Sequence, residues 1–180
     1  MSDETEHPAL PRQPQCVVVC GLPGVGKTTV AEIVADYIDA RHKRSDEIRH
    51  GLFVEPSYSA EETAMVYDEL LSRCEAALSQ GESIVLDATF RDAHQRDRVH
   101  LIAEKHGVPV EQLIVTADDE TVQDRLSDRD GLSDADFAVY EDLANEFDPV
   151  EHNAHYIDNS GLLTDTRDQI LDALSHPVEQ

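Results

Sequence analysis

Residues 21–28, Gly-Leu-Pro-Gly-Val-Gly-Lys-Thr, constrain the fold of this chain more than any other stretch. They fit the pattern G-x-x-x-x-G-K-[ST], which is typical of a phosphate-binding loop. The β-branched segment 16–20 precedes them and predicts a short buried strand, and residues 27–39 carry apolar side chains at helical spacing. A strand, a glycine-rich loop and a helix in this order predict an α/β fold that binds a nucleoside triphosphate.

The loop suits phosphate for three physical reasons. Its glycines allow a tight backbone curl that turns N–H groups inward, and the following helix directs the positive end of its dipole to the same point. Lys27 adds a charge for the β- and γ-phosphates, and Thr28 offers a hydroxyl to Mg²⁺. The residues predicted to bind the nucleotide are Gly21, Leu22, Pro23, Gly24, Val25, Gly26, Lys27, Thr28 and Thr29. A chance glycine turn is the alternative, and it leaves the flanking strand and helix unexplained.

Strand and helix signals alternate along the rest of the chain, which is typical of a doubly wound parallel sheet. Further strands are predicted near 40–44, 83–87, 113–117 and 155–158. Helices are predicted over 27–39, from 45 onward, and over 60–80, 92–106, 121–129, 134–147 and 167–174. The apolar stripe of the helix 60–80 is expected to consist of Met65, Leu70, Leu71, Cys74, Ala77 and Leu78. Residues 1–14 are predicted to form a loose, proline-containing acidic tail before a single domain at 15–176.

The charge of the chain is strongly negative. There are 38 acidic and 14 basic residues, which gives a formal net charge of −24. The acidic residues are spread along the sequence and 40% of residues are hydrophobic, so disorder is not favoured. We interpret the charge as a halophilic surface whose repulsion is screened by high salt, with an acidic partner-binding surface as the alternative. Nucleic acid is disfavoured as a partner, although basic clusters remain at 91–98 and 125–129.

The cysteines and the apolar runs bear on the location of the protein. Cys16, Cys20 and Cys74 are odd in number and form no C-x-x-C pattern, so we expect core packing rather than a zinc site. Apolar runs of about five residues are far shorter than the roughly 20 that span a bilayer. No signal-peptide pattern opens the chain, and we therefore expect a cytoplasmic monomer without a membrane segment.

Two acidic residues are candidates for the chemistry. Asp87 ends the most apolar predicted strand, where ligands of parallel sheets bind, so we expect it to hold Mg²⁺; capping of the next turn is the alternative. Asp46 and Arg49 lie three residues apart at a predicted helix start. Asp46 suits the orientation or deprotonation of an acceptor hydroxyl, and Arg49 suits a phosphate. A helix cap with a surface ion pair is the competing interpretation.

Several other residues are candidates for ligand binding. Arg125 and Arg129 lie one helical turn apart before Asp130-Gly131, which suits a lid over the triphosphate. An exposed helix with weak Asp–Arg pairs is the alternative. Thr89, Arg91 and Arg96 follow Asp87 and are candidate contacts to the acceptor, or else ordinary solvated residues at a helix start.

The order and spacing of these motifs resemble the small P-loop kinases related to the kinase domain of bacteriophage polynucleotide kinase. These are often grouped with zeta-toxin-like and AAA-type kinases. The matching segments are 21–29, Ser45-Asp46-x-x-Arg49, Asp87-Ala88-Thr89-Phe90-Arg91, Arg125-x-x-x-Arg129, 133–135 and Phe147-Asp148-Pro149. The resemblance covers roughly residues 15–160. It implies a three-layer α/β fold, a sheet of about five strands in the order 2-3-1-4-5, and a lid, which is short in this chain.

The resemblance also implies an enzyme that uses ATP and Mg²⁺ to phosphorylate a hydroxyl acceptor. In that reading Asp46 is the general base, Arg49 contacts phosphate or substrate, and Arg125 and Arg129 are lid arginines. Family members act on polynucleotide ends, small molecules and sugar nucleotides, so the acceptor does not carry over. The basic segment 41–44 and the short lid 130–132 depart from the family pattern. The rival hypothesis is an ATP-binding sensing or regulatory module without an acceptor.

Overall fold

The computed structural model describes residues 13–130, 134–150 and 154–176. Five parallel strands form one sheet in the order β2-β3-β1-β4-β5. The strands are β1 (Cys16–Cys20), β2 (Arg41–Arg44), β3 (Ile84–Asp87), β4 (Val110–Thr116) and β5 (Ala154–Asp158). The predicted fold class and strand order are confirmed. Most of the predicted tail 1–14 lies outside the described residues, so the domain boundary at 15 stays a prediction.

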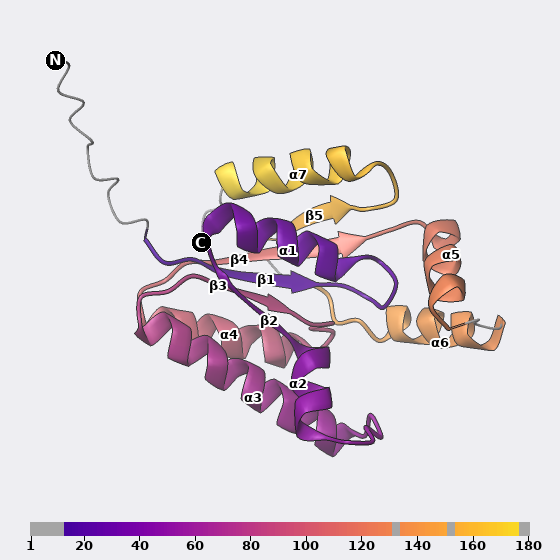
Figure 1. The fold of residues 1–180 in the computed structure, drawn as a ribbon, viewed down its shortest axis with the longest axis horizontal. Coiled ribbons are helices and arrows are strands. Elements are labelled where there is room, and N and C mark those ends of the chain that lie inside the picture. The colour runs from indigo at the N-terminus through magenta and orange to yellow at the C-terminus, as the bar shows by residue number, and fades with distance from the viewer. Residues whose placement is uncertain (1–12, 131–133, 151–153, 177–180) are drawn as a thin grey trace, which may run out of the picture.

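The helices cover both faces of the sheet and one of its ends. They are α1 (Lys27–Ile38), α2 (Ser45–Leu52), α3 (Ala60–Ser79), α4 (Ala93–Lys105), α5 (Asp119–Asp130), α6 (Asp134–Asn145) and α7 (Leu163–Ser175). Helices α1 and α7 lie on one face and α3 and α4 on the other, and α2, α5 and α6 lie toward the carboxyl ends of the strands (Figure 1). In the described ranges no helix is both long and apolar enough to cross a bilayer.

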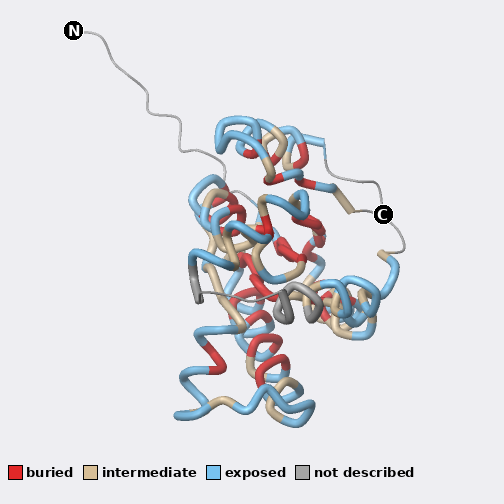
Figure 2. Tube along the Cα trace, turned by 90° about the vertical axis from the view of Figure 1, so that its right-hand side faces the viewer, coloured by how far each residue is buried: buried red, intermediate tan, exposed pale blue. Residues whose placement is uncertain are grey.

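The core consists of two layers, one on each side of the sheet, and the buried stretches follow the central strands and the inner sides of the helices (Figure 2). All five residues of β1 are buried, because this strand is central and both of its faces are covered. The basic strand β2 is possible because, among the described strands, it pairs with β3 alone and lies at the edge of the sheet. An edge strand keeps long charged side chains partly in solvent, which explains why the segment 41–44 departs from a hydrophobic pattern.

Two details differ from the sequence expectation. Met65 is exposed, whereas Val66 and Tyr67 join the buried stripe of α3. Met65 lies five residues before Leu70, and this spacing turns it away from the sheet. Strand β4 begins at Val110 rather than near 113. The prediction was late because the polar residue Gln112 interrupts the apolar pattern of the sequence. In the structure Gln112 is buried within the strand, and its Nε2 contacts His100 Nε2 at 2.9 Å.

The three cysteines are fully buried, as expected for small core residues. A hydrogen bond with Cys74, together with burial, raises the pKa of the Cys16 thiol, and burial raises the pKa of Cys20 to about 12. Thiolates are therefore scarce in the folded state. We expect a thiol reagent to leave all three cysteines unmodified in the native protein and to modify all three after unfolding.

The same pKa shifts predict an alkaline loss of stability. Above the ordinary thiol pKa the unfolded chain releases protons that the folded chain keeps, so the free energy of unfolding decreases as the pH rises further. Denaturant unfolding at pH 8 and pH 10, roughly on either side of an ordinary thiol pKa, measures this effect. Equal stability at both values, or rapid modification of the native protein, would contradict the burial of these thiols.

Candidate active site

The glycine-rich loop joins β1 to α1 and depends on its glycines for its shape. Gly24 and Gly26 have φ values of 84° and 90°, a left-handed region that favours glycine. A Cβ atom on Gly26 would also overlap Asn159 Nδ2. The loop backbone at Gly26 therefore packs closely against the residue that follows β5, which is far away in the sequence.

A polar clamp fixes the back of the loop. Val25 O accepts hydrogen bonds from Asn159 Nδ2 at 2.9 Å and from Arg125 Nη1 at 3.1 Å. Arg125 Nη2 donates to Asn159 O at 2.7 Å, and Thr166 Oγ1 donates to Asn159 Oδ1 at 2.9 Å. Arg125 thus binds the loop backbone, and these contacts favour positioning of the loop over a lid role. The side chain of Arg129 and residues 131–133 of the predicted lid lie outside the described part.

We expect Asn159→Ala to lower the free energy of unfolding by about 1–3 kcal/mol, because it removes one donor to Val25 O and the closer acceptor of the buried Thr166 hydroxyl, which keeps only Leu162 O at 3.4 Å. ATP affinity should fall with it, since the loop loses a support. Denaturant unfolding and calorimetric titration with ATP measure the two effects. The matched control is Asn145→Ala at the exposed end of α6, and equal behaviour of the two variants would refute the clamp.

Asp87 is the point at which three elements meet. Its Oδ2 accepts a hydrogen bond from Thr28 Oγ1 at 2.9 Å and lies 3.3 Å from His42 Nε2 and 3.5 Å from Arg44 Nε. The Asp87 residue is 4% exposed. Within the described part of the chain, its carboxylate contacts α1 and β2 rather than the turn that follows β3. Turn capping, the alternative role for Asp87, is therefore not supported.

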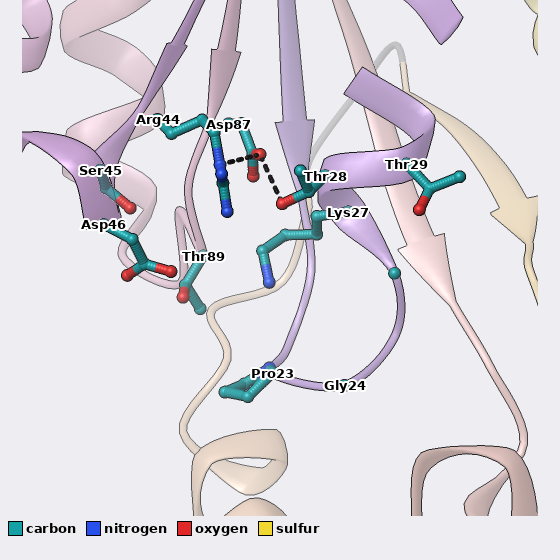
Figure 3. A pocket seen from close by; sticks show the side chains of 11 residues that line it. Pro23, Gly24, Lys27, Thr28, Thr29, Arg44, Ser45, Asp46, Asp87 and Thr89 are labelled. Carbon is teal, nitrogen blue, oxygen red and sulfur yellow. Dashed lines mark hydrogen bonds and ion pairs between the residues drawn. The ribbon is translucent and has the colours of Figure 1, made fainter. Parts of the chain in front are cut away.

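A cleft with an empty volume of about 760 Å³, open to solvent, lies between the loop and the start of α2. Its lining residues come from the loop, α1, β2, α2 and the end of β3, and they are Pro23, Gly24, Gly26, Lys27, Thr28, Thr29, Arg44, Ser45, Asp46, Asp87 and Thr89. Lys27 Nζ donates to Leu22 O at 2.9 Å, within its own loop. Figure 3 shows Lys27 on one side of this cleft, with Asp46 and Thr89 on the other.

The structure separates Asp46 from Arg49, which sequence spacing had paired. Helix α2 begins at Ser45 with Arg44 at the N-cap position and no side-chain cap, so Asp46 is not the helix cap. Arg49 is buried at the junction of α2 and α3, where its Nη2 donates to Thr63 Oγ1 at 3.1 Å. Its guanidinium lies 4.7 Å from the centre of the Tyr58 ring. Asp46 therefore lines the cleft and Arg49 does not.

A carboxylate accompanies the buried Arg49. Glu62 Oε2 lies 3.6 Å from Arg49 Nη1 and accepts hydrogen bonds from the backbone N–H groups of Ser57 and Tyr58, both at 2.8 Å. Partial burial raises the pKa of Glu62, but these hydrogen bonds and the charge of Arg49 outweigh it and lower the pKa overall. These contacts indicate that Arg49 stabilises the loop between α2 and α3.

Arg91 and Arg96, two predicted acceptor contacts, lie outside the cleft lining. Arg96 donates to the carbonyls of Phe90 at 2.6 Å, Arg91 at 3.1 Å, Asp148 at 3.1 Å and Pro149 at 2.9 Å. Arg91 Nη1 forms a 2.6 Å ion pair with the exposed Glu146. Arg96 therefore ties the segment after β3 to the segment after α6, which indicates a structural role. Of the three predicted acceptor contacts that follow Asp87, Thr89 alone lines the cleft.

The structure also shows residues that sequence reasoning missed. His42 and Arg44 contact Asp87, and Asn159 and Thr166 belong to the clamp behind the loop. In the sequence, the unusual basic composition of 41–44 could have indicated a role for His42 and Arg44. A polar residue directly after a strand was the signal for Asn159.

The chemistry of this site suits a hard cation. Thr28 and Asp87 offer a hydroxyl and a carboxylate oxygen within 2.9 Å of each other. Mg²⁺ takes one or two such protein ligands and completes its shell with water and phosphate oxygens. In the described residues no group of three or more His, Cys, Asp or Glu side chains could hold a metal by itself. The ligand set thus fits a cation that is bound together with a polyphosphate.

Comparison with known proteins places this geometry in context. The family described as "AAA domain" matches residues 16–150. The uncharacterized protein Rv2004c of Mycobacterium tuberculosis (strain H37Rv) is 30% identical in an alignment of 158 residues, which covers 80% of this chain. The chain spans about a third of the length of that relative, 31%.

Two solved structures share the fold. The Mycobacterium tuberculosis APS kinase CysC, in complex with AMPPNP and APS, has a TM-score of 0.69 at 18% identity, covering 92% of this chain and 100% of that one. A gluconokinase from Sinorhizobium meliloti has a TM-score of 0.70 at 17% identity, with coverage of 91% and 93%. At such low identity these likenesses show that the architecture is shared.

Proposed function

The chain belongs to the AAA domain family, and from this premise we propose that it is a kinase that uses ATP and Mg²⁺ to phosphorylate a hydroxyl acceptor. The observation that carries the proposal is the cleft itself: Lys27, the hydrogen-bonded pair Thr28 and Asp87, and the carboxylate of Asp46 line one space. Proteins of the same fold that are named as kinases support phosphoryl transfer as the reaction.

In the proposed mechanism the loop holds the triphosphate. Backbone N–H groups of residues 24–28 and the ammonium of Lys27 would contact the β- and γ-phosphates. Thr28 and Asp87 would hold Mg²⁺, which neutralises charge on the phosphate oxygens when bound. Arg125 and Asn159 keep the loop in shape from behind. We assign Arg129 as the candidate lid arginine and Arg49 as a residue that positions α2.

The acceptor lies in the cleft against the wall that Ser45, Asp46 and Thr89 form. Asp46 accepts a hydrogen bond from the acceptor hydroxyl and takes its proton while the hydroxyl oxygen bonds to the γ-phosphorus. The bond between that phosphorus and the bridging oxygen breaks, and ADP leaves with its electrons. Lys27 and the loop N–H groups stabilise the charge that builds up in this loose transition state.

We further propose that the protein works as a cytoplasmic monomer in concentrated salt. The formal charge of −24, spread along the whole chain, supports the concentrated salt, because salt would screen the repulsion between the acidic residues. This charge also favours small acceptors over nucleic acid.

The test is a search for a phosphorylated product. The protein is incubated with ATP, Mg²⁺ and a panel of sugars, nucleosides and their derivatives in multimolar KCl, and products are identified by mass spectrometry. A kinase produces ADP and a phosphorylated compound in equal amounts. ADP with inorganic phosphate alone, across the whole panel, would contradict the proposal and favour the sensing module.

A further inference from the structure

Arg44 is a cation in the cleft to which sequence analysis gave no role. It ends β2, and the parallel register places it opposite Asp87 on β3. Its side chain is 31% exposed and lines the cleft. In Figure 3 the guanidinium points from the end of β2 into the space between Lys27 and Thr89.

The polar contacts of Arg44 are weaker than those of the structural arginines. Arg96 and Arg125 donate to backbone carbonyls at distances as short as 2.6 and 2.7 Å. Arg44 Nε is buried without a hydrogen bond and lies 3.5 Å from Asp87 Oδ2, and Nη1 lies 3.4 Å from Glu47 Oε1. A guanidinium whose Nε–H is buried without a hydrogen bond, and whose contacts to carboxylates are long, favours the binding of an anion.

The position of Arg44 relates it to the acceptor rather than to ATP. Ser45 and Asp46 follow it directly and line the same wall, whereas Lys27 and Thr28 belong to the loop on the other side. The cleft thus holds one cation on each side of the space in which transfer would occur. In a chain with a net charge of −24, an anionic acceptor would be repelled by most of the surface, so a fixed cation here has a large effect on its binding.

We propose that Arg44 binds an oxyanion group of the acceptor, a phosphate or a carboxylate. The planar guanidinium matches two oxygens of either group, which a single ammonium does not. The acceptor class is then a small hydroxyl compound that carries such a group, and this inference rests on the kinase function proposed above. It also assigns to Arg44 the substrate contact that the family resemblance had implied for Arg49.

The experiment compares Arg44→Gln and Arg44→Lys with the matched control Arg41→Gln. Arg41 lies on the same strand, carries the same charge and pairs with the partly exposed Glu82 outside the cleft lining. With AMPPNP and Mg²⁺ present, binding of inorganic phosphate and of acetate is measured by calorimetry at one KCl concentration. We expect Arg44→Gln to weaken binding of at least one anion by about 10- to 100-fold, Arg44→Lys to weaken it less, and Arg41→Gln to leave it unchanged.

A second arm uses matched acceptor pairs, ribose 5-phosphate with ribose and gluconate with glucose. The wild type should prefer the charged member, and Arg44→Gln should remove that preference by lowering kcat/KM for the charged compound alone. Loss of preference within the ribose pair indicates that Arg44 binds a phosphate, and loss within the gluconate pair indicates that it binds a carboxylate. Equal losses for charged and neutral compounds, or an altered dependence on Mg²⁺ with anion binding intact, would show that Arg44 serves only as a partner of Asp87 and would overturn the inference.

The two proposals fail in different ways. If no compound is phosphorylated but Arg44→Gln abolishes phosphate binding, the kinase function is wrong and the anion site stands. If phosphorylation occurs and Arg44→Gln changes neither anion binding nor acceptor preference, the kinase function stands and the role of Arg44 is wrong. Wild-type protein that binds neither anion with AMPPNP present would also overturn the role of Arg44.

Discussion

Asp46→Asn is expected to lower kcat by about 10²- to 10⁴-fold, because the amide keeps the size of the side chain but cannot take the proton of the acceptor hydroxyl. ATP binding should change little, since Asp46 lies across the cleft from the loop. Initial rates of ADP formation with a saturating acceptor measure kcat, and calorimetry with AMPPNP measures nucleotide affinity.

The control for this variant is Asp36→Asn, which removes one exposed carboxylate from α1 outside the cleft lining. It separates the loss of a base from a general effect of charge. A rate within about 2-fold of the wild type for Asp46→Asn would be far smaller than the effect of losing a general base. In that case Asp46 would not be the base, and the proton would have to leave through another group.

Lys27→Ala is expected to lower kcat/KM for ATP by at least about 10²- to 10³-fold, since it removes the cation that would contact the β- and γ-phosphates in the proposed mechanism. Unlike Asp46→Asn, it should weaken nucleotide binding as well as transfer. The chain has only three lysines, and Lys105, exposed and paired with Glu75 at 3.8 Å, provides the control Lys105→Ala.

Calorimetric titration with ATP and Mg²⁺ and steady-state kinetics measure both parts of the Lys27 effect. Unfolding experiments on the same samples check that the variant folds, because the loop is also held by Asn159 and Arg125. If Lys27→Ala bound and used ATP like Lys105→Ala, the loop would not be the nucleotide site. The kinase proposal would then lose its foundation.

The sequence predicted the features that depend on neighbouring residues. The loop 21–28 is continuous in the chain, and its glycines, its lysine and its flanking elements all act locally, so the pattern predicted the backbone that the structure shows. The sheet order came from the family resemblance and is confirmed. Strand β4 was placed too late because a buried glutamine, whose Nε2 contacts a histidine from α4, looks polar in a sequence.

The roles of the arginines could not be predicted in this way. Arg49, Arg96 and Arg125 are all long cations near motifs, and spacing alone does not show where their donors point. Their observed partners are distant in sequence: Thr63 for Arg49, residues 148–149 for Arg96, and Val25 for Arg125. Arg44 looked like an anomaly of an edge strand until parallel pairing placed it opposite Asp87. Tertiary packing decides which arginine faces the cleft.

The clamp on Val25 has a consequence for biosynthesis. The glycine-rich loop is synthesised before Asn159, which supports its backbone and is added more than a hundred residues later. A nascent chain therefore carries the loop without this support until β5 docks beside β4, and the proposed nucleotide binding would become stable only at that point. Nucleotide capture would then act as a late checkpoint that reports completion of the sheet.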